Sequence, residues 1–81
     1  MNEQSWQEQD GVLYRKFDFD HFSDAMEFVQ QVGLCAEDLG HHPDIKISFN
    51  SVELRLTTHD KGNVVTKKDR ELAEAIDALR G

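Results

Sequence analysis

Apolar and polar residues alternate most clearly between residues 45 and 56, and this alternation predicts an antiparallel hairpin. A period of two puts successive side chains on opposite faces of a strand. A two-residue turn at Asn50-Ser51 would pair Phe49 with Val52. That register places all the apolar residues of the segment on one face: Ile45, Ile47, Phe49, Val52, Leu54 and Leu56.

A second hairpin is predicted nearer the N-terminus, around Asp10-Gly11. This dipeptide favours a type I′ turn, because both central residues of that turn need a positive φ. The turn would pair Gln9 with Val12. It would also gather the apolar side chains of both strands on one face: Trp6, Leu13, Phe17 and Phe19.

Apolar residues recur at helical spacing after this hairpin, at Ala25, Phe28, Val29, Val32, Ala36 and Leu39. Ser23 is a good N-cap, so we expect the helix to start after it. Gly40 is expected to end the helix in the left-handed conformation, and Pro43 blocks any continuation.

A second helix is predicted after a loop over residues 61–65. Thr66 has the character of an N-cap, and Asp69 lies where the acid of a capping box lies. The apolar stripe of this helix comprises Leu72, Ala73, Ile76 and Leu79. The chain is therefore predicted to be two hairpins, each followed by a helix. No repeat or linker divides it, so residues 1–81 are expected to form one domain.

Size and charge limit the functions open to this chain of 81 residues. Its net charge of −7 argues against unassisted binding to nucleic acid or to an anionic membrane. No apolar run approaches the ~18 residues of a spanning helix, and no signal-peptide pattern is visible. Cys35 is the only cysteine, so a reduced, cytoplasmic location is expected. Because so short a chain buries a small core, we expect a homo-oligomer.

Histidines supply the candidate chemistry. Three of the four lie in two short segments, His41-His42-Pro43-Asp44 and Thr57-Thr58-His59-Asp60. Imidazole can both accept and donate a proton near neutral pH. Extending the predicted hairpin register puts His42 opposite His59 on the polar face. His41 would then lie opposite Asp60, unless Pro43 turns the chain.

Three chemical interpretations compete for these histidines. Zinc binding is disfavoured, because adjacent residues of an extended segment point apart and the usual ligand spacings are absent. A nucleophilic triad is weaker still, since no serine lies in a nucleophile-elbow motif and Cys35 is predicted to be buried. Acid–base catalysis needs only two imidazoles in opposite protonation states. Each histidine taken alone is more often a hydrogen-bonded surface group, and only their convergence favours catalysis.

The spaced motifs together resemble the pterin-4a-carbinolamine dehydratases. The resemblance covers roughly residues 25 to 79 and rests on Glu37, His41-His42-Pro43-Asp44, Phe49-Asn50-Ser51-Val52, Leu56-Thr57-Thr58-His59-Asp60, Thr66-x-x-Asp69 and Leu72-Ala73. It implies an α+β fold, with a four-stranded antiparallel sheet backed by helices on one face. The N-terminal helix common in the family is not seen in the sequence, so a compact member is expected.

The same resemblance implies roles for individual residues. His41 and His59 correspond to the acid–base pair, and His42 to a group that positions the pterin. The supporting or substrate-binding residues would be Glu37, Pro43, Asp44, Thr58, Asp60 and Asp69. The implied set contains no metal and no cofactor.

The implied reaction is dehydration of 4a-hydroxytetrahydropterin to quinonoid dihydropterin, which recycles the cofactor of aromatic amino-acid hydroxylases. The implied partners are the pterin substrate, further copies of the chain in a dimer or tetramer, and such a hydroxylase. An alternative is a catalytically inactive scaffold, because relatives act as a transcription cofactor or as a RuBisCO assembly factor. The retained histidines favour the enzyme.

Overall fold

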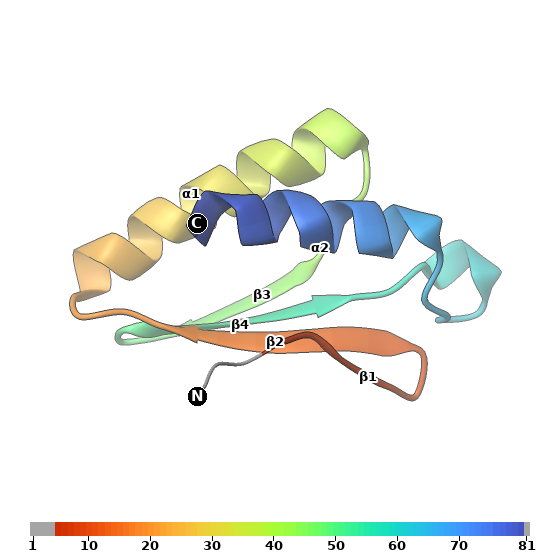
Figure 1. Cartoon of the computed structure of the whole chain (residues 1–81), viewed down its shortest axis with the longest axis horizontal. Coiled ribbons are helices and arrows are strands. Elements are labelled where there is room, and N and C mark those ends of the chain that lie inside the picture. Colours follow the sequence, from red (N-terminus) through yellow and green to blue (C-terminus); the bar gives the residue numbers. More distant parts are fainter. Residues whose placement is uncertain (1–4, 81) are drawn as a thin grey trace.

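A computed structural model describes residues 5–80 of the chain. Its elements in order are β1 (Gln7–Gln9), β2 (Val12–Asp18), α1 (Phe22–Leu39), β3 (Asp44–Ser48), β4 (Ser51–Leu56), the 3-10 turn η1 (His59–Lys61) and α2 (Lys67–Arg80). The strands form one antiparallel sheet in the order β1-β2-β4-β3. Both helices cover the same face of this sheet (Figure 1). The predicted α+β architecture is therefore confirmed.

The first hairpin forms as the sequence predicts. Asp10 and Gly11 have φ values of 54° and 79°, as a type I′ turn requires. Gln9 pairs with Val12 across the turn. Trp6 reaches the predicted face, where its ring lies edge-on to Phe17 with the ring centroids 6.1 Å apart.

The second hairpin forms, but its predicted register is wrong. The turn lies at Phe49-Asn50, so Ser48 pairs with Ser51 and Ile47 pairs with Val52. The side chain of Asn50 donates a hydrogen bond of 2.7 Å to the carbonyl of Phe19, and the N–H of Phe19 donates one of 2.9 Å to the carbonyl of Asn50. This tertiary contact fixes Asn50 inside the turn. Because the register changes by two residues, the apolar residues that stay in the strands keep their predicted face.

Helix α1 begins earlier than predicted. Its N-cap is His21 rather than Ser23, and the His21 carbonyl accepts the first helical hydrogen bond, from Ala25 N–H at 3.2 Å. Ser23 therefore lies within the first turn, and the His21 side chain makes no capping bond. The predicted end is confirmed, because Gly40 follows the helix with a φ of 66°. No helix among the described residues is long and apolar enough to cross a membrane.

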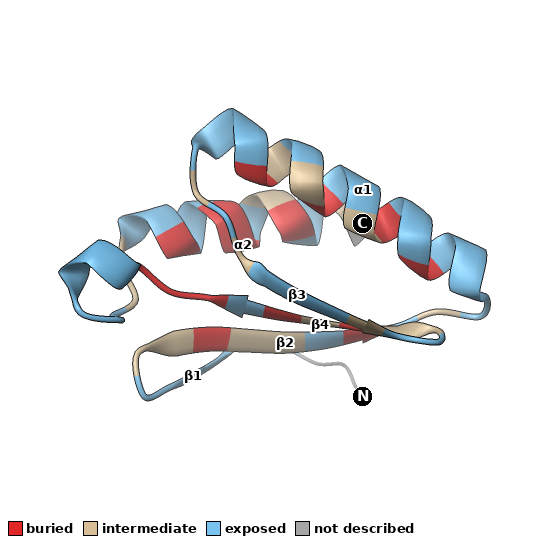
Figure 2. Ribbon diagram, turned by 180° about the vertical axis from the view of Figure 1, so that it is seen from behind, coloured by how far each residue is buried: buried red, intermediate tan, exposed pale blue. Residues whose placement is uncertain are grey.

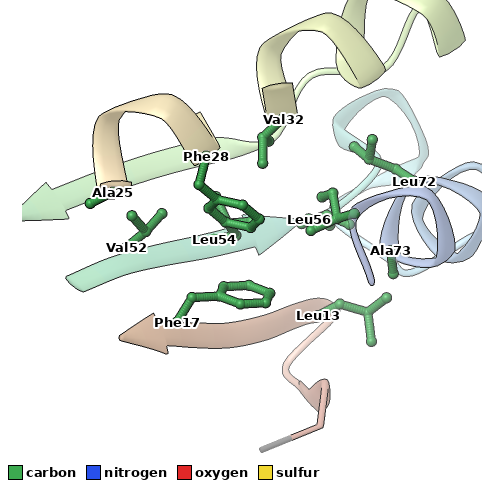
Figure 3. Close-up of a cluster of buried hydrophobic side chains, with 11 residues drawn as sticks. Leu13, Phe17, Ala25, Phe28, Val32, Val52, Leu54, Leu56, Leu72 and Ala73 are labelled. Carbon is green, nitrogen blue, oxygen red and sulfur yellow. The ribbon is translucent and has the colours of Figure 1, made fainter. Parts of the chain in front are cut away.

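The core lies between the two helices and the central strands β2 and β4. Figure 3 shows Phe28 and Val32 of α1 above Phe17, Leu54 and Leu56 of the sheet. The buried cluster comprises Leu13, Phe17, Ala25, Phe28, Val32, Val52, Leu54, Leu56, Leu72, Ala73 and Ile76. Residues of the edge strand β3 are exposed or half-buried (Figure 2). The central strands therefore supply the rigid base on which the connections at their ends are held.

Five segments meet at one end of the molecule in both Figure 1 and Figure 2: the end of α1, the start of β3, the end of β4, η1 and the start of α2. The tip of the first hairpin reaches the same end. Thr57 donates a hydrogen bond of 2.6 Å to the carbonyl of Gly11. A Cβ on Gly11 would lie 1.9 Å from the carbonyl oxygen of Asn63. The hairpin tip therefore supports the loop that follows β4.

Replacing Gly11 with Ala should destabilise the protein. The new methyl group would collide with the Asn63 carbonyl, and the φ of 79° is strained for Ala. We expect a loss of about 1–3 kcal/mol in the free energy of unfolding, measured by urea denaturation.

Gly33→Ala is the matched control for this experiment. Gly33 lies inside α1, and a Cβ there would meet no atom within 4 Å. Because alanine has a higher helix propensity than glycine, Gly33→Ala should stabilise the protein by about 0.5–1 kcal/mol. Equal stability of Gly11→Ala and the unmodified protein would refute the supporting role of the hairpin tip.

Candidate active site

The site is built around the carboxylate of Asp69, which is fully buried in the first turn of α2. Its Oδ2 accepts hydrogen bonds from the N–H of Thr66 at 2.9 Å and from the hydroxyl of Thr58 at 2.8 Å. The hydroxyl groups of Thr58 and Thr66 lie 2.7 Å apart. Asp69 therefore acts as the predicted capping acid and also links α2 to the end of β4.

The other oxygen of Asp69 binds His41. The distance from His41 Nε2 to Asp69 Oδ1 is 2.5 Å, and the His41 side chain is only 12% exposed. His41 reaches Asp69 from the connection between α1 and β3, where its N–H bonds to the carbonyl of Ala36 at 3.0 Å. The turn that ends α1 thus aims this histidine toward the start of α2.

Hydrogen bonding decides the protonation state of Asp69. Burial acts to raise the pKa of this carboxyl group, but the hydrogen bonds from His41, the Thr66 N–H and the Thr58 hydroxyl outweigh it and hold the pKa below 3.8. An ionised carboxylate only accepts hydrogen bonds, so His41 carries a proton on Nε2. The ring can then exchange its second proton only at Nδ1.

His59 lies on η1, directly after Thr58. Its Nδ1 is 2.9 Å from the Oδ1 of Asn63, and both residues are exposed. Thr58 forms an isolated bridge with Val64, which closes the loop that contains both residues. Thr58 also donates a hydrogen bond to Asp69, so the residue directly before His59 is fixed to the buried carboxylate. His41 and His59 are thus joined through Asp69 and Thr58.

His42 takes a different direction from His41. Its Nε2 lies 2.6 Å from the Oε2 of Glu37 on the surface, where the two side chains are 64% and 75% exposed. The predicted pairing of His42 with His59 is wrong, because the ladder ends at Asp44 opposite Arg55. Glu37 therefore accompanies His42 rather than His41.

The remaining predicted residues surround these pairs. Pro43 is half-buried between His42 and β3, Asp44 is the exposed first residue of β3, and Asp60 is exposed on η1. Among residues 5–80, no three His, Cys, Asp or Glu side chains are grouped so that they could hold a metal ion.

Sequence reasoning did not identify two residues as part of the site, Thr66 and Asn63. The sequence predicts Thr66 as a helix cap, and the capping pattern already places its N–H beside Asp69. For Asn63 the sequence predicts a loop. Its signal was weak: an Asn that follows Gly62 and lies four residues after a histidine. Asn tolerates the left-handed conformation that such a turn needs, and its φ here is 60°.

Comparisons with known proteins identify the family of the chain. Residues 1–79 match the family model described as pterin 4 alpha carbinolamine dehydratase. Relatives from Picosynechococcus sp. and Chloroflexus aurantiacus, each named "Putative pterin-4-alpha-carbinolamine dehydratase", are 45% and 46% identical. The first match covers 91% of this chain and 79% of the relative, and the second covers 94% and 81%.

Two solved structures share the fold. The transcriptional coactivator/pterin dehydratase from Brucella melitensis superposes with a TM-score of 0.87 at 38% identity, over 94% of this chain and 82% of that one. A pterin dehydratase-like protein identified as a RuBisCO assembly factor of the alpha-carboxysome superposes with a TM-score of 0.76. At 23% identity, over 99% of this chain and 92% of that one, it shows the fold alone. From the family match, the relatives and the shared fold, the chain belongs to the pterin 4 alpha carbinolamine dehydratase family.

Proposed function

We propose that the protein is a hydro-lyase that converts 4a-hydroxytetrahydropterin to quinonoid dihydropterin and water, and so serves tetrahydropterin recycling. The observation that carries this proposal is the buried Asp69 carboxylate, which holds His41 in one tautomer. A histidine that serves only as a surface group needs no such partner. The relatives named as dehydratases supply the substrate class.

The reaction needs one proton donor and one proton acceptor. The bond between C4a and the hydroxyl oxygen breaks as that oxygen takes a proton and leaves as water. The neighbouring N5 loses its proton, and its electron pair forms the new C=N bond. One proton is given and one is taken, so the reaction is balanced without any external reagent. Two imidazoles in opposite protonation states supply both steps.

His41 and His59 are the proposed acid–base pair. His41 exchanges its proton at Nδ1, because Asp69 occupies Nε2. His59 exchanges at Nε2, because Asn63 occupies Nδ1. His42, which is exposed and paired with Glu37, is proposed to bind and position the pterin. Pro43, Asp44 and Asp60 are proposed to shape the rim of the same site.

A second candidate function is assembly without catalysis. The solved RuBisCO assembly factor has this fold, and the Brucella protein is described as both a coactivator and a dehydratase. A scaffold would need the surface of the fold but not a histidine held by a buried carboxylate. Dehydratase turnover above the spontaneous rate separates the two functions, since the scaffold predicts none.

Histidine variants test the proposed roles. His41→Ala and His59→Ala should each lower kcat by about 10²–10⁴-fold, because each removes one proton-transfer group. His42→Ala should mainly raise KM, since a positioning group contributes to ground-state binding. The measurements are kcat and KM with 4a-hydroxytetrahydropterin, with a circular dichroism melt for each variant.

His21→Ala is the matched control, because His21 is exposed at the N-cap of α1 and makes no side-chain capping bond. It should keep the kcat and KM of the unmodified protein. Full kcat in His59→Ala would remove that residue from the acid–base pair. Absence of turnover in the unmodified protein would favour the scaffold.

Asp69→Asn should change the tautomer of His41 while keeping the shape of the side chain. The Thr66 N–H is a fixed donor, so the amide oxygen must face it and the amide NH₂ must face His41. His41 Nε2 then has to accept, so the proton of the neutral ring moves to Nδ1, and that atom loses the lone pair with which it would take a proton from the substrate. We expect kcat to fall by about 10²-fold or more, in a steady-state assay near pH 7.

The same variant has a second signature in stability. Because the pKa of Asp69 is lowered by folding, its contribution is fully present above the ordinary value of 3.8 and is lost as the pH falls through the lower folded-state value. Asp69→Asn should be less stable than the unmodified protein by about 1–3 kcal/mol at pH 7. Urea midpoints should converge as the pH falls below the ordinary value. A constant difference from pH 7 to pH 2 would contradict the assigned ionisation.

Self-association is also proposed. Large apolar side chains on α1 and around the β3–β4 hairpin are exposed, among them Phe22, Leu34, Ile45 and Phe49. Burial of such surface between copies would stabilise a chain with so small a core. Sedimentation velocity at micromolar concentration should give a dimer or a tetramer. A species of 9.3 kDa would show that the monomer is stable alone.

A further inference from the structure

We propose that Asn63 is a positioning residue that sets the tautomer and the orientation of His59. Its Oδ1 accepts a hydrogen bond from the Nδ1–H of His59 at 2.9 Å. The neutral ring then keeps its lone pair on Nε2, which is the atom that would exchange a proton with substrate. This inference rests on the proposed function and adds a residue that acts through His59 rather than on the pterin.

The backbone of the loop places Asn63 for this contact. The N–H of Asn63 donates to the Thr58 carbonyl at 3.1 Å, and the N–H of Gly62 donates to the His59 carbonyl at 3.0 Å. These bonds fold the chain back over η1, so that a side chain at position 63 faces the imidazole at position 59. Asn63 has a φ of 60°, which Asn tolerates better than most residues.

The first hairpin holds this loop from outside the site. A Cβ on Gly11 would lie 1.9 Å from the Asn63 carbonyl oxygen, so the two backbones are in direct contact. The hydrogen bond from Thr57 to the Gly11 carbonyl fixes the hairpin tip against β4. Asn63 is thus held between the hairpin and the histidine, although its side chain lies at the surface.

The partner of His59 differs in kind from those of the other two site histidines. His41 and His42 each bind a carboxylate, from Asp69 and Glu37 respectively. A carboxylate orients an imidazole and also stabilises its protonated form by charge. An amide oxygen orients the ring and selects the tautomer without adding a charge. The side chain of Asn63 therefore sets the orientation and the tautomer of His59 but adds no charge beside the ring.

Asn63→Gly isolates the side chain, because glycine adopts the left-handed backbone at no steric cost. When the His59 ring is neutral, its Nδ1–H tautomer should lose population in this variant. The 15N chemical shifts of the imidazole nitrogens measure the tautomer, and the His59→Ala variant identifies which signals belong to His59. The kcat should fall about 10-fold while KM stays within about 2-fold, as for residues that orient a reacting group. Urea denaturation should show no loss of stability.

Two further variants sharpen the test. Asn63→Asp keeps an acceptor oxygen in the same place, so it should retain the Nδ1–H tautomer that Asn63→Gly loses. Lys61→Ala changes an exposed neighbour on η1 and should alter neither the tautomer nor kcat.

The outcomes separate this inference from the proposed function. An unchanged His59 tautomer and kcat in Asn63→Gly, with turnover in the unmodified protein, overturns the role of Asn63 and leaves the proposed function standing. A changed tautomer in Asn63→Gly, with no turnover in the unmodified protein, overturns the proposed function and supports the pairing of Asn63 with His59. A joint change in tautomer and kcat supports both.

Discussion

The buried carboxylate of Asp69 is the interaction on which this end of the molecule depends. A charge without solvent costs several kcal/mol unless hydrogen bonds replace the lost water. Three donors from three segments do so here: Thr66 before α2, Thr58 after β4 and His41 after α1. Because all three are needed to satisfy one carboxylate, the segments that carry them are brought to one place.

This dependence joins the stability of the fold to the chemistry of the site. The carboxylate lies in the first turn of α2, where the unpaired N–H groups of a helix favour a negative charge. The same carboxylate fixes the protonated nitrogen of His41. A change at Asp69 that weakens the helix cap therefore also removes the hydrogen bond that orients His41. Selection for the proposed activity would thus also preserve the first turn of α2.

Local patterns predicted most of the fold, because the face of each strand and the stripe of each helix follow from spacing. They failed where a distant contact decided the outcome. Asn50 is fixed by Phe19, 31 residues away, and this moved the second turn by one position. The resemblance assigned both His41 and Asp69 to the site, but their contact spans 28 residues and depends on how α2 lies over the sheet. The contact between Asn63 and His59 is local, but an Asn after Gly62 is so common in turns that it gave only a weak signal.

The contact between Gly11 and Asn63 has a consequence for how the family can vary. The hairpin tip and the η1 loop touch backbone to backbone, without side chains that could adjust to a new distance. An insertion in either segment would push the other away and carry His59 with it. The lengths of these two surface turns should therefore change together among homologues. A homologue with a longer η1 loop should also have a first hairpin of different shape.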